Sequence, residues 1–105
     1  MPAGPKKLGV LISVPPNHSN FNHGVCLAAT ALAHGMDVYL YCIDEAVEGL
    51  GDPRLHKLKA EGLKLFACAY GAQRRNVPMS DEATFSGLSL LNDVIASADR
   101  FVSFN

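Results

Sequence analysis

The chain has 105 residues, a length that suits one compact domain and leaves no room for a second. Hydrophobic residues make up 49% of it and charged residues 18%, a balance typical of globular proteins that excludes a disordered chain. The formal net charge of −1 at pH 7 gives no overall field that would attract nucleic acid. We therefore expect a single soluble domain over residues 1–105, with no nucleic acid among its partners.

Three cysteines, Cys26, Cys42 and Cys68, are spaced too widely for a C-x-x-C motif and are odd in number. Such a set argues against a disulfide framework and is typical of a reducing compartment. The apolar run after the N-terminus is too short for a secretory signal or a membrane span. We expect a cytoplasmic protein that has no contact with membranes.

The first part of the chain predicts a strand, a helix and a second strand. Residues 8–14 form a nearly continuous apolar run, typical of a parallel strand covered on both faces, and two prolines end it. Apolar residues then recur at helical spacing from Phe21 to Leu32, and Gly35 is a suitable left-handed cap. Residues 37–43 are rich in strand formers, so the three elements predict a right-handed parallel βαβ unit.

The middle of the chain predicts a short helix and a third strand. Residues 44–51 are acidic and contain two glycines, which favours a loop or a single helical turn. Asp52 followed by Pro53 is a favourable N-cap and first helical residue, so a short helix should follow and end at Gly62. Residues 63–68 then predict the third strand.

The last part of the chain predicts two helical segments and a closing strand. Residues 69–77 permit one helical turn before a proline breaks it. We expect the next helix to be capped near Ser80, with an apolar stripe that runs from Phe85 to Ile95. A fourth short strand over residues 101–104 closes the chain.

This alternation of strands and helices predicts an α/β fold. We expect a small doubly wound parallel sheet of about four strands, with helices on both faces. The carboxyl ends of the strands meet at one rim, which is where open α/β sheets bind ligands. So small a sheet has exposed edges, and partner subunits are one way to cover them.

The candidate site lies around Cys68, at the end of the third predicted strand. The chain places this cysteine before a helical turn and near Arg74 and Arg75, and both features favour the reactive thiolate over the thiol. Tyr70 can contribute a hydroxyl there or simply pack against a neighbour. The alternative interpretation is that Cys68 is a small buried hydrophobe and that the two arginines are a solvated pair.

Two histidines, His18 and His23, lie in the predicted loop after the first strand, which reaches the same rim as Cys68. A cysteine with histidine and arginine nearby can act as a nucleophile or carry a transferred sulfur. Solvated surface histidines are the alternative. Two histidines five positions apart in a loop make no standard metal-ligand pattern, so we expect no metal. A zinc site that uses His18, His23 and a cysteine is the alternative hypothesis.

The usual nucleotide-binding signatures are missing from the sequence. Neither a glycine-rich dinucleotide fingerprint nor a phosphate-binding P-loop follows the first predicted strand. Pro15 and Pro16 occupy the place where a phosphate-cradling glycine loop would begin. We therefore expect no nucleotide and no other cofactor.

Two segments resemble a known family. Residues 66–77, Phe-Ala-Cys-Ala-Tyr-Gly-Ala-Gln-Arg-Arg-Asn-Val, and the closing segment 98–104 are similar to those of the DsrE/DsrF-like family, which includes the TusD-type sulfur-relay proteins. The resemblance covers nearly the whole chain. It implies that Cys68 accepts sulfane sulfur as a persulfide and passes it on between sulfur donor and acceptor proteins. It also implies assembly as trimers or hexamers, with the cysteine near a subunit boundary.

Two hypotheses follow for the function. In the first, the protein is a small cytoplasmic sulfur carrier or sulfurtransferase-like protein with a persulfide on Cys68. An anion or substrate pocket around that cysteine would then draw on five residues: His18, His23, Tyr70, Arg74 and Arg75. In the second, the protein is a non-catalytic oligomeric module that binds a small anionic ligand or a partner protein, and Cys68 is incidental. The sequence leaves open whether the protein is an enzyme.

Overall fold

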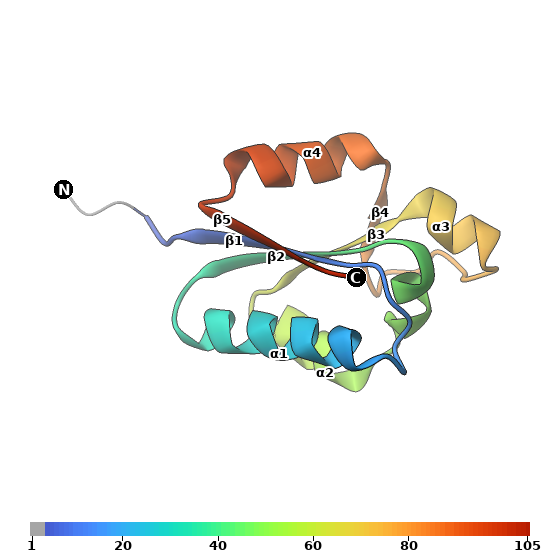
Figure 1. Ribbon diagram of the computed structural model, residues 1–105, viewed down its shortest axis with the longest axis horizontal. Helices are drawn as coiled ribbons and strands as arrows, with labels where there is room; N and C mark the ends of the chain where they lie inside the picture. Colours follow the sequence, from blue (N-terminus) through green and yellow to red (C-terminus); the bar gives the residue numbers. More distant parts are fainter. Residues whose placement is uncertain (1–3) are drawn as a thin grey trace.

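The computed structural model describes residues 4–105 and shows a five-stranded sheet with helices on both faces (Figure 1). The strands lie in the order β4-β3-β2-β1-β5, and all neighbouring pairs are parallel. The α/β fold predicted from the sequence is therefore confirmed, with five strands in place of about four. Residues 1–3 of the predicted domain lie outside the described residues, so its extent over 1–105 stays a prediction. The bounds of the strands are β1 (Lys7–Ile12), β2 (Asp37–Cys42), β3 (Lys64–Cys68), β4 (Thr84–Ser86) and β5 (Arg100–Phe104).

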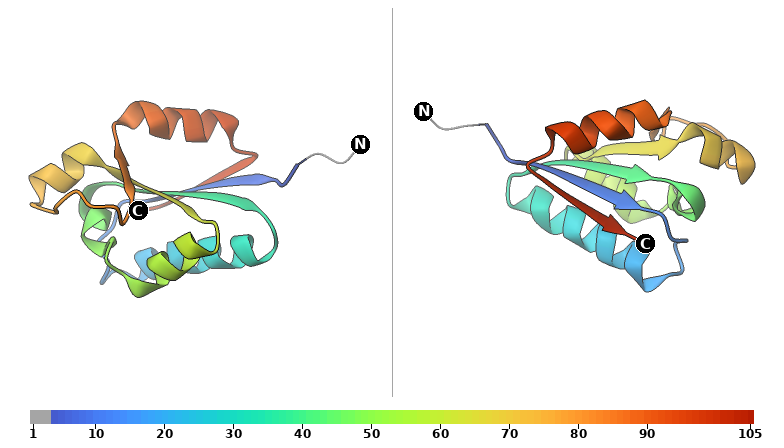
Figure 2. Two further views of the ribbon diagram at one scale, coloured as in Figure 1. Left: turned by 180° about the vertical axis from the view of Figure 1, so that it is seen from behind. Right: turned by 45° about the horizontal axis from the view of Figure 1, so that its top comes forward.

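The helices form a layer on each face of the sheet. α1 (Ser19–Ala33) and α2 (Pro53–Ala60) lie side by side on one face, and α4 (Leu88–Ser97) covers the other (Figure 1 and Figure 2). α3 (Ala69–Arg74) follows the carboxyl end of β3 and packs against η1 (Asp44–Gly49), a 3-10 helix. Within residues 4–105, no helix has both the length and the apolar character that crossing a membrane requires.

Local capping signals explain where the helices begin and end. The Nδ1 atom of His18 accepts a hydrogen bond from the Asn20 N–H at 3.0 Å and so caps the start of α1. Gly35, with a φ of +82°, ends this helix in the left-handed conformation that the sequence predicts. The Asp52 carboxylate accepts the Arg54 N–H at 2.8 Å, which confirms the predicted cap of α2.

The main core lies between the sheet and the layer formed by α1 and α2. Ile12 and Leu40 from the strands pack there with Phe21 and Val25 of α1, and each of these side chains is almost or fully buried. The helix approaches the sheet closely at Gly24, where an added Cβ would lie 2.7 Å from the Ile12 Cδ1 atom. This packing fixes the sheet and therefore the rim on which the candidate site lies.

The segment before α4 differs from the sequence prediction. Residues Thr84–Ser86 form β4 rather than a helix, and α4 begins only at Leu88. Ser80 lies in the preceding loop, where its hydroxyl accepts a backbone N–H without capping a helix. Phe85 pairs beside Ala67 of β3 and packs against the main core. The helical spacing was misleading because a three-residue strand is too short to show its own period.

Candidate functional site

Cys68 is the last residue of β3 and directly precedes α3. Its Sγ atom accepts a hydrogen bond from the Gly71 N–H at 3.4 Å, so the cysteine side chain caps this short helix. Only 8% of the residue is exposed. The structure therefore places Cys68 at the rim of the sheet and at a helix start, as expected, but with its sulfur largely covered.

The cover over Cys68 comes from the α4 face of the sheet. Tyr41 of β2 and Leu91 of α4 form one buried cluster with it. The Tyr41 ring also packs beside Phe66 of β3, with 6.5 Å between the ring centroids and 20° between the ring planes. The thiol therefore faces aromatic and aliphatic side chains on this side.

Tyr41 is a functional candidate that the sequence analysis missed. Its hydroxyl donates to the Gly87 carbonyl oxygen at 3.1 Å and lies 3.2 Å from the Ser86 Oγ atom. Burial raises the pKa of Tyr41; the Ser86 hydrogen bond lowers it and the nearby Cys68 raises it, with a net upward shift. The phenol therefore stays protonated at neutral pH. No local motif signals it, because residues 37–43 show only the composition of a strand.

The other side of Cys68 is formed by backbone from η1 and α3. A Cβ atom on Gly71 would lie 3.4 Å from the Asp44 backbone nitrogen and 3.8 Å from the Cys68 Sγ atom. Asp44 has a φ of +50°, a left-handed conformation that turns the chain sharply as it leaves β2. This turn brings η1 beside the start of α3, so backbone groups approach the sulfur closely.

The basic pair and Tyr70 lie on α3, outside the buried cluster. Tyr70 is 67% exposed, and the Arg74 guanidinium carbon lies 5.8 Å from the centre of its ring. Arg74 is exposed, and Arg75, at the end of the helix, is half-buried. Among residues 4–105, no hydrogen bond or ion pair joins either arginine to Cys68. The structure thus brings Tyr70 and Arg74 together but holds neither against the sulfur.

His18 and His23 lie at the start of α1. His23 is within this helix, so the prediction of a loop that carries both histidines is wrong. Both rings make local contacts: His18 caps the helix, and the His23 Nδ1 atom lies 3.2 Å from the Asn20 Oδ1 atom. β2 separates β1 from β3. In the described part of the chain, neither histidine hydrogen-bonds to Cys68.

The remaining cysteines have opposite environments. Cys42 is fully buried, and burial raises the pKa of its thiol to about 12. Cys26 is exposed on α1, which contradicts the core or near-core position that the sequence favours for both Cys26 and Cys42. Across residues 4–105, no cluster of three or more His, Cys, Asp or Glu side chains is arranged to hold a metal ion.

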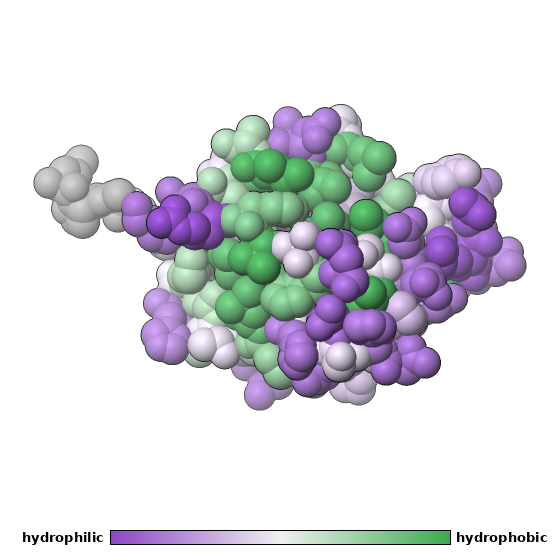
Figure 3. Space-filling view, in the orientation of Figure 1, coloured by the Kyte–Doolittle hydropathy of each residue, from purple (hydrophilic) through white to green (hydrophobic). Residues whose placement is uncertain are grey.

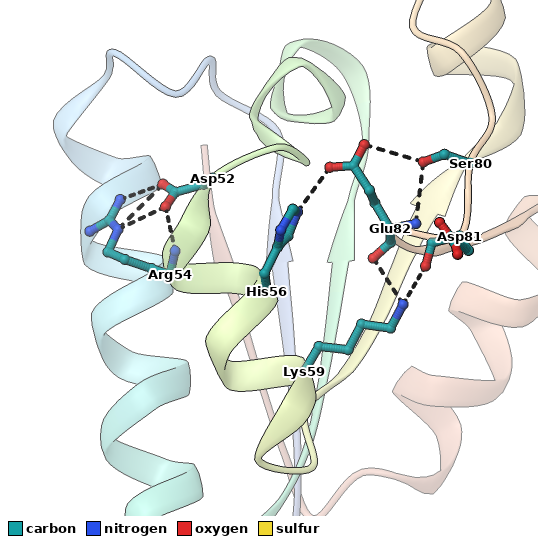
Figure 4. A network of polar contacts seen from close by, with 7 residues as sticks. All are labelled: Asp52, Arg54, His56, Lys59, Ser80, Asp81 and Glu82. Atoms are coloured by element: carbon teal, nitrogen blue, oxygen red, sulfur yellow. Dashed lines mark hydrogen bonds and ion pairs between the residues drawn. The ribbon is translucent and has the colours of Figure 1, made fainter.

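A separate polar network ties the loop before β4 to α2 (Figure 4). The His56 Nε2 atom lies 2.9 Å from the Glu82 Oε2 atom. The Lys59 ammonium donates to the carbonyl oxygens of Asp81 and Glu82 at 2.5 and 3.2 Å. These residues and Ala60 line an open hollow of about 450 Å³. The network lies on the helix layer opposite α4 and connects α2 to the loop that leads into β4.

Comparisons with known proteins agree with this architecture. The model of the DsrE/DsrF-like family matches residues 6–104. The fold is similar to the crystal structure of the ychN protein from E. coli, with a TM-score of 0.79 and 19% sequence identity over 95% of this chain and 99% of that chain. At this identity the likeness concerns the fold. No curated protein matches the chain in sequence.

Proposed function

The chain belongs to the DsrE/DsrF-like family, a family generally associated with sulfur relay, and we propose that it is a small sulfur carrier or sulfurtransferase-like protein that holds sulfane sulfur as a persulfide on Cys68. The observation that carries this proposal is the position of Cys68 at the carboxyl end of β3, with its sulfur accepting the Gly71 N–H at 3.4 Å. This backbone donor holds the sulfur at the rim where open α/β sheets bind ligands.

In the proposed step, the Cys68 thiolate attacks the sulfane sulfur of a donor persulfide. A new S–S bond forms at Sγ, the S–S bond of the donor breaks, and the donor leaves as a thiolate. The proton of the Cys68 thiol passes to solvent, and no external oxidant or reductant is required. An acceptor thiolate then removes the terminal sulfur by the same exchange and regenerates Cys68.

The proposed anion or substrate pocket uses the side chains that surround the rim. Tyr70, Arg74 and Arg75 follow Cys68 on α3, and charge-assisted hydrogen bonds from a guanidinium group would stabilise a persulfide or an anionic group of the donor. His18 and His23 lie at the start of α1, across β2 from Cys68. In this proposal they contact the outer part of a bound donor rather than the sulfur itself.

Sulfur donor and acceptor proteins are the proposed partners, and the protein itself is proposed to form a homo-oligomer, a trimer or a hexamer. Among residues 4–105, β5 is an edge strand of the sheet, which supports this because an edge strand presents unpaired backbone groups. Figure 3 shows hydrophobic side chains gathered on the face between α1 and α4, around this strand. The apolar residues that line a groove beside this strand are Leu8, Leu27, Ala31, Met36 and Val102. The unpaired cysteines support a cytoplasmic location as part of the same proposal.

Intact-protein mass spectrometry after incubation with a sulfane-sulfur donor tests the carrier function. The wild type should gain about 32 Da per sulfur atom, reversed by reductant, and Cys68→Ser should gain nothing. Cys26→Ser is the matched control: Cys26 is exposed, and its loss should leave the gain unchanged. No gain in folded wild type with reduced thiols, or a full gain in Cys68→Ser, would contradict the proposal.

The burial of Cys68 favours one second candidate. With only 8% of the residue exposed, Cys68 also fits a core cysteine in a non-catalytic oligomeric module that binds a small anionic ligand or a partner protein. In that case Cys68→Ser should leave the oligomeric state unchanged, as measured by sedimentation, and the wild type should take up no sulfane sulfur. The two measurements together separate the candidates.

A further inference from the structure

The side chain of Tyr41 crosses an entire strand to reach its hydrogen-bond partners. Tyr41 belongs to β2 and is paired with Phe66 of β3, but its hydroxyl bonds to Ser86 and Gly87 at the end of β4. Since neighbouring strands lie about 4.8 Å apart, the phenol spans the width of β3. Cys68 lies two residues after Phe66, so its side chain is on the same face of the strand. The phenol therefore passes beside the Cys68 side chain, and the two share one buried cluster.

The hydrogen bonds of Tyr41 fasten the turn that covers Cys68. Ser86 is the register partner of Cys68, and the next residue, Gly87, leads into α4, which places Leu91 over the cysteine. The phenol has one proton, which is shared between the carbonyl oxygens of Gly87 at 3.1 Å and Ser86 at 3.3 Å, and the Ser86 Oγ atom lies 3.2 Å from the phenol oxygen. The upward shift in the pKa of Tyr41 keeps that proton in place at neutral pH.

We propose that Tyr41 is a positioning residue that controls access to Cys68: it holds the Ser86–Gly87 turn beside the sulfur, and this turn moves before a sulfur donor reaches Sγ. The closed turn explains why so little of Cys68 is exposed. A persulfide formed under it is shielded from stray thiols until an acceptor opens the turn. The shielding of a persulfide rests on the proposed sulfur-carrier function. The control of access to Cys68 by Tyr41 is tested without sulfane sulfur.

The test measures alkylation by iodoacetamide of the native protein in a Cys26→Ser background, quantified separately at Cys68 and Cys42 by peptide mass spectrometry. Tyr41→Phe keeps the ring and removes the hydroxyl. Loss of a hydrogen bond of ordinary net strength makes opening of the turn about fivefold more frequent, so Cys68 should react about fivefold faster. Cys42 is fully buried in β2 and is the internal control for opening of the whole sheet. Its rate reports opening of the whole sheet and should stay far below that of Cys68 in both proteins.

A second variant and a pH profile separate access from other effects. Ser86→Ala leaves the Tyr41 proton on Gly87 and should give a smaller increase, and the double variant should not exceed Tyr41→Phe alone. When the alkylation rate of Cys68 is plotted against pH, the plateau should be higher in Tyr41→Phe than in the wild type. The midpoint of the curve should be the same in both proteins, since the proton of the phenol is bonded to backbone carbonyl oxygens and not to the sulfur.

Three results would overturn the inference: an unchanged Cys68 rate in Tyr41→Phe, a Cys42 rate as high as that of Cys68, or a shifted midpoint with an unchanged plateau. Alkylation does not depend on sulfur transfer. If the wild type takes up no sulfane sulfur but Tyr41→Phe selectively accelerates the reaction of Cys68, the carrier function fails and the role of Tyr41 stands. If the wild type takes up sulfane sulfur but Tyr41→Phe does not accelerate the reaction of Cys68, only the role of Tyr41 is rejected.

Discussion

The contact between Gly49 and Phe21 gives a prediction about what holds η1 in place beside α3. Phe21 of α1 is fully buried, and Gly49 is the last residue of η1. A Cβ atom at position 49 would lie 2.4 Å from the Phe21 Cζ atom and 3.2 Å from the Pro16 Cβ atom. Atoms do not approach that closely, so Gly49→Ala forces the Phe21 ring to move within the core. We expect this substitution to lower the free energy of unfolding.

The magnitude follows from the packing. Gly49 is not among the glycines with positive φ, so alanine causes no backbone strain and the effect is steric. Overpacking of a core costs about 1–3 kcal/mol, and we expect about 2 kcal/mol here. Phe21→Leu alone leaves space in the core and costs about 1–2 kcal/mol. The leucine also makes room for the new methyl group, so the double variant should lose about 1–2 kcal/mol less than the sum of the single losses.

Urea unfolding followed by circular dichroism, at one fixed protein concentration, measures all four members of this cycle. Gly51→Ala is the matched control. Two residues further on, an added Cβ would meet only the Glu82 Oε2 atom at 3.7 Å, an ordinary contact, so stability should change by less than about 0.5 kcal/mol. Additive losses in the double variant, or wild-type stability in Gly49→Ala, would refute the packing argument.

Two further predictions concern titratable side chains. The Arg54 guanidinium holds the pKa of Asp52 below its ordinary value of 3.8, so the charge of Asp52 stabilises the fold above that pH and the contribution is lost as the pH falls through the lower folded value. Asp52→Asn keeps an N-cap acceptor but removes the charge, so it should lower the free energy of unfolding in urea by roughly 0.5 kcal/mol at pH 7 and by almost nothing at strongly acidic pH. A loss of stability that is constant with pH would contradict this. In the native protein at pH 8, Cys26 should react readily with iodoacetamide while Cys42, with a pKa of about 12, reacts only on unfolding, since roughly one thiol in 10,000 is ionised. Comparable native rates at the two cysteines would show that Cys42 is not enclosed as described.

Much of the fold could be predicted because its signals are local. A continuous apolar run indicated β1 as a covered parallel strand, and strand-forming residues indicated β2. Gly35 and Asp52 marked the helix boundaries where the structure has them. The position of Cys68 was predictable in the same way, since a cysteine at a strand end followed by a helical turn is visible in the sequence. The exposure of Cys26 could not be predicted, because helical spacing alone does not show how much of the surface of α1 the sheet and α2 cover.

The two largest omissions, β4 and Tyr41, have one physical cause. β4 has three residues and exists through its pairing with β3, in which Ser86 aligns with Cys68. Tyr41 finds its partners 45 and 46 residues away, and only this pairing brings them within reach of its hydroxyl. If residues 84–86 were helical, as their spacing suggested, Tyr41 would have no partners at Ser86 and Gly87, and the turn would not lie beside the sulfur. The burial of Cys68 therefore depends on a non-local strand pairing, and an assessment of its reactivity from local sequence omits the group that covers it.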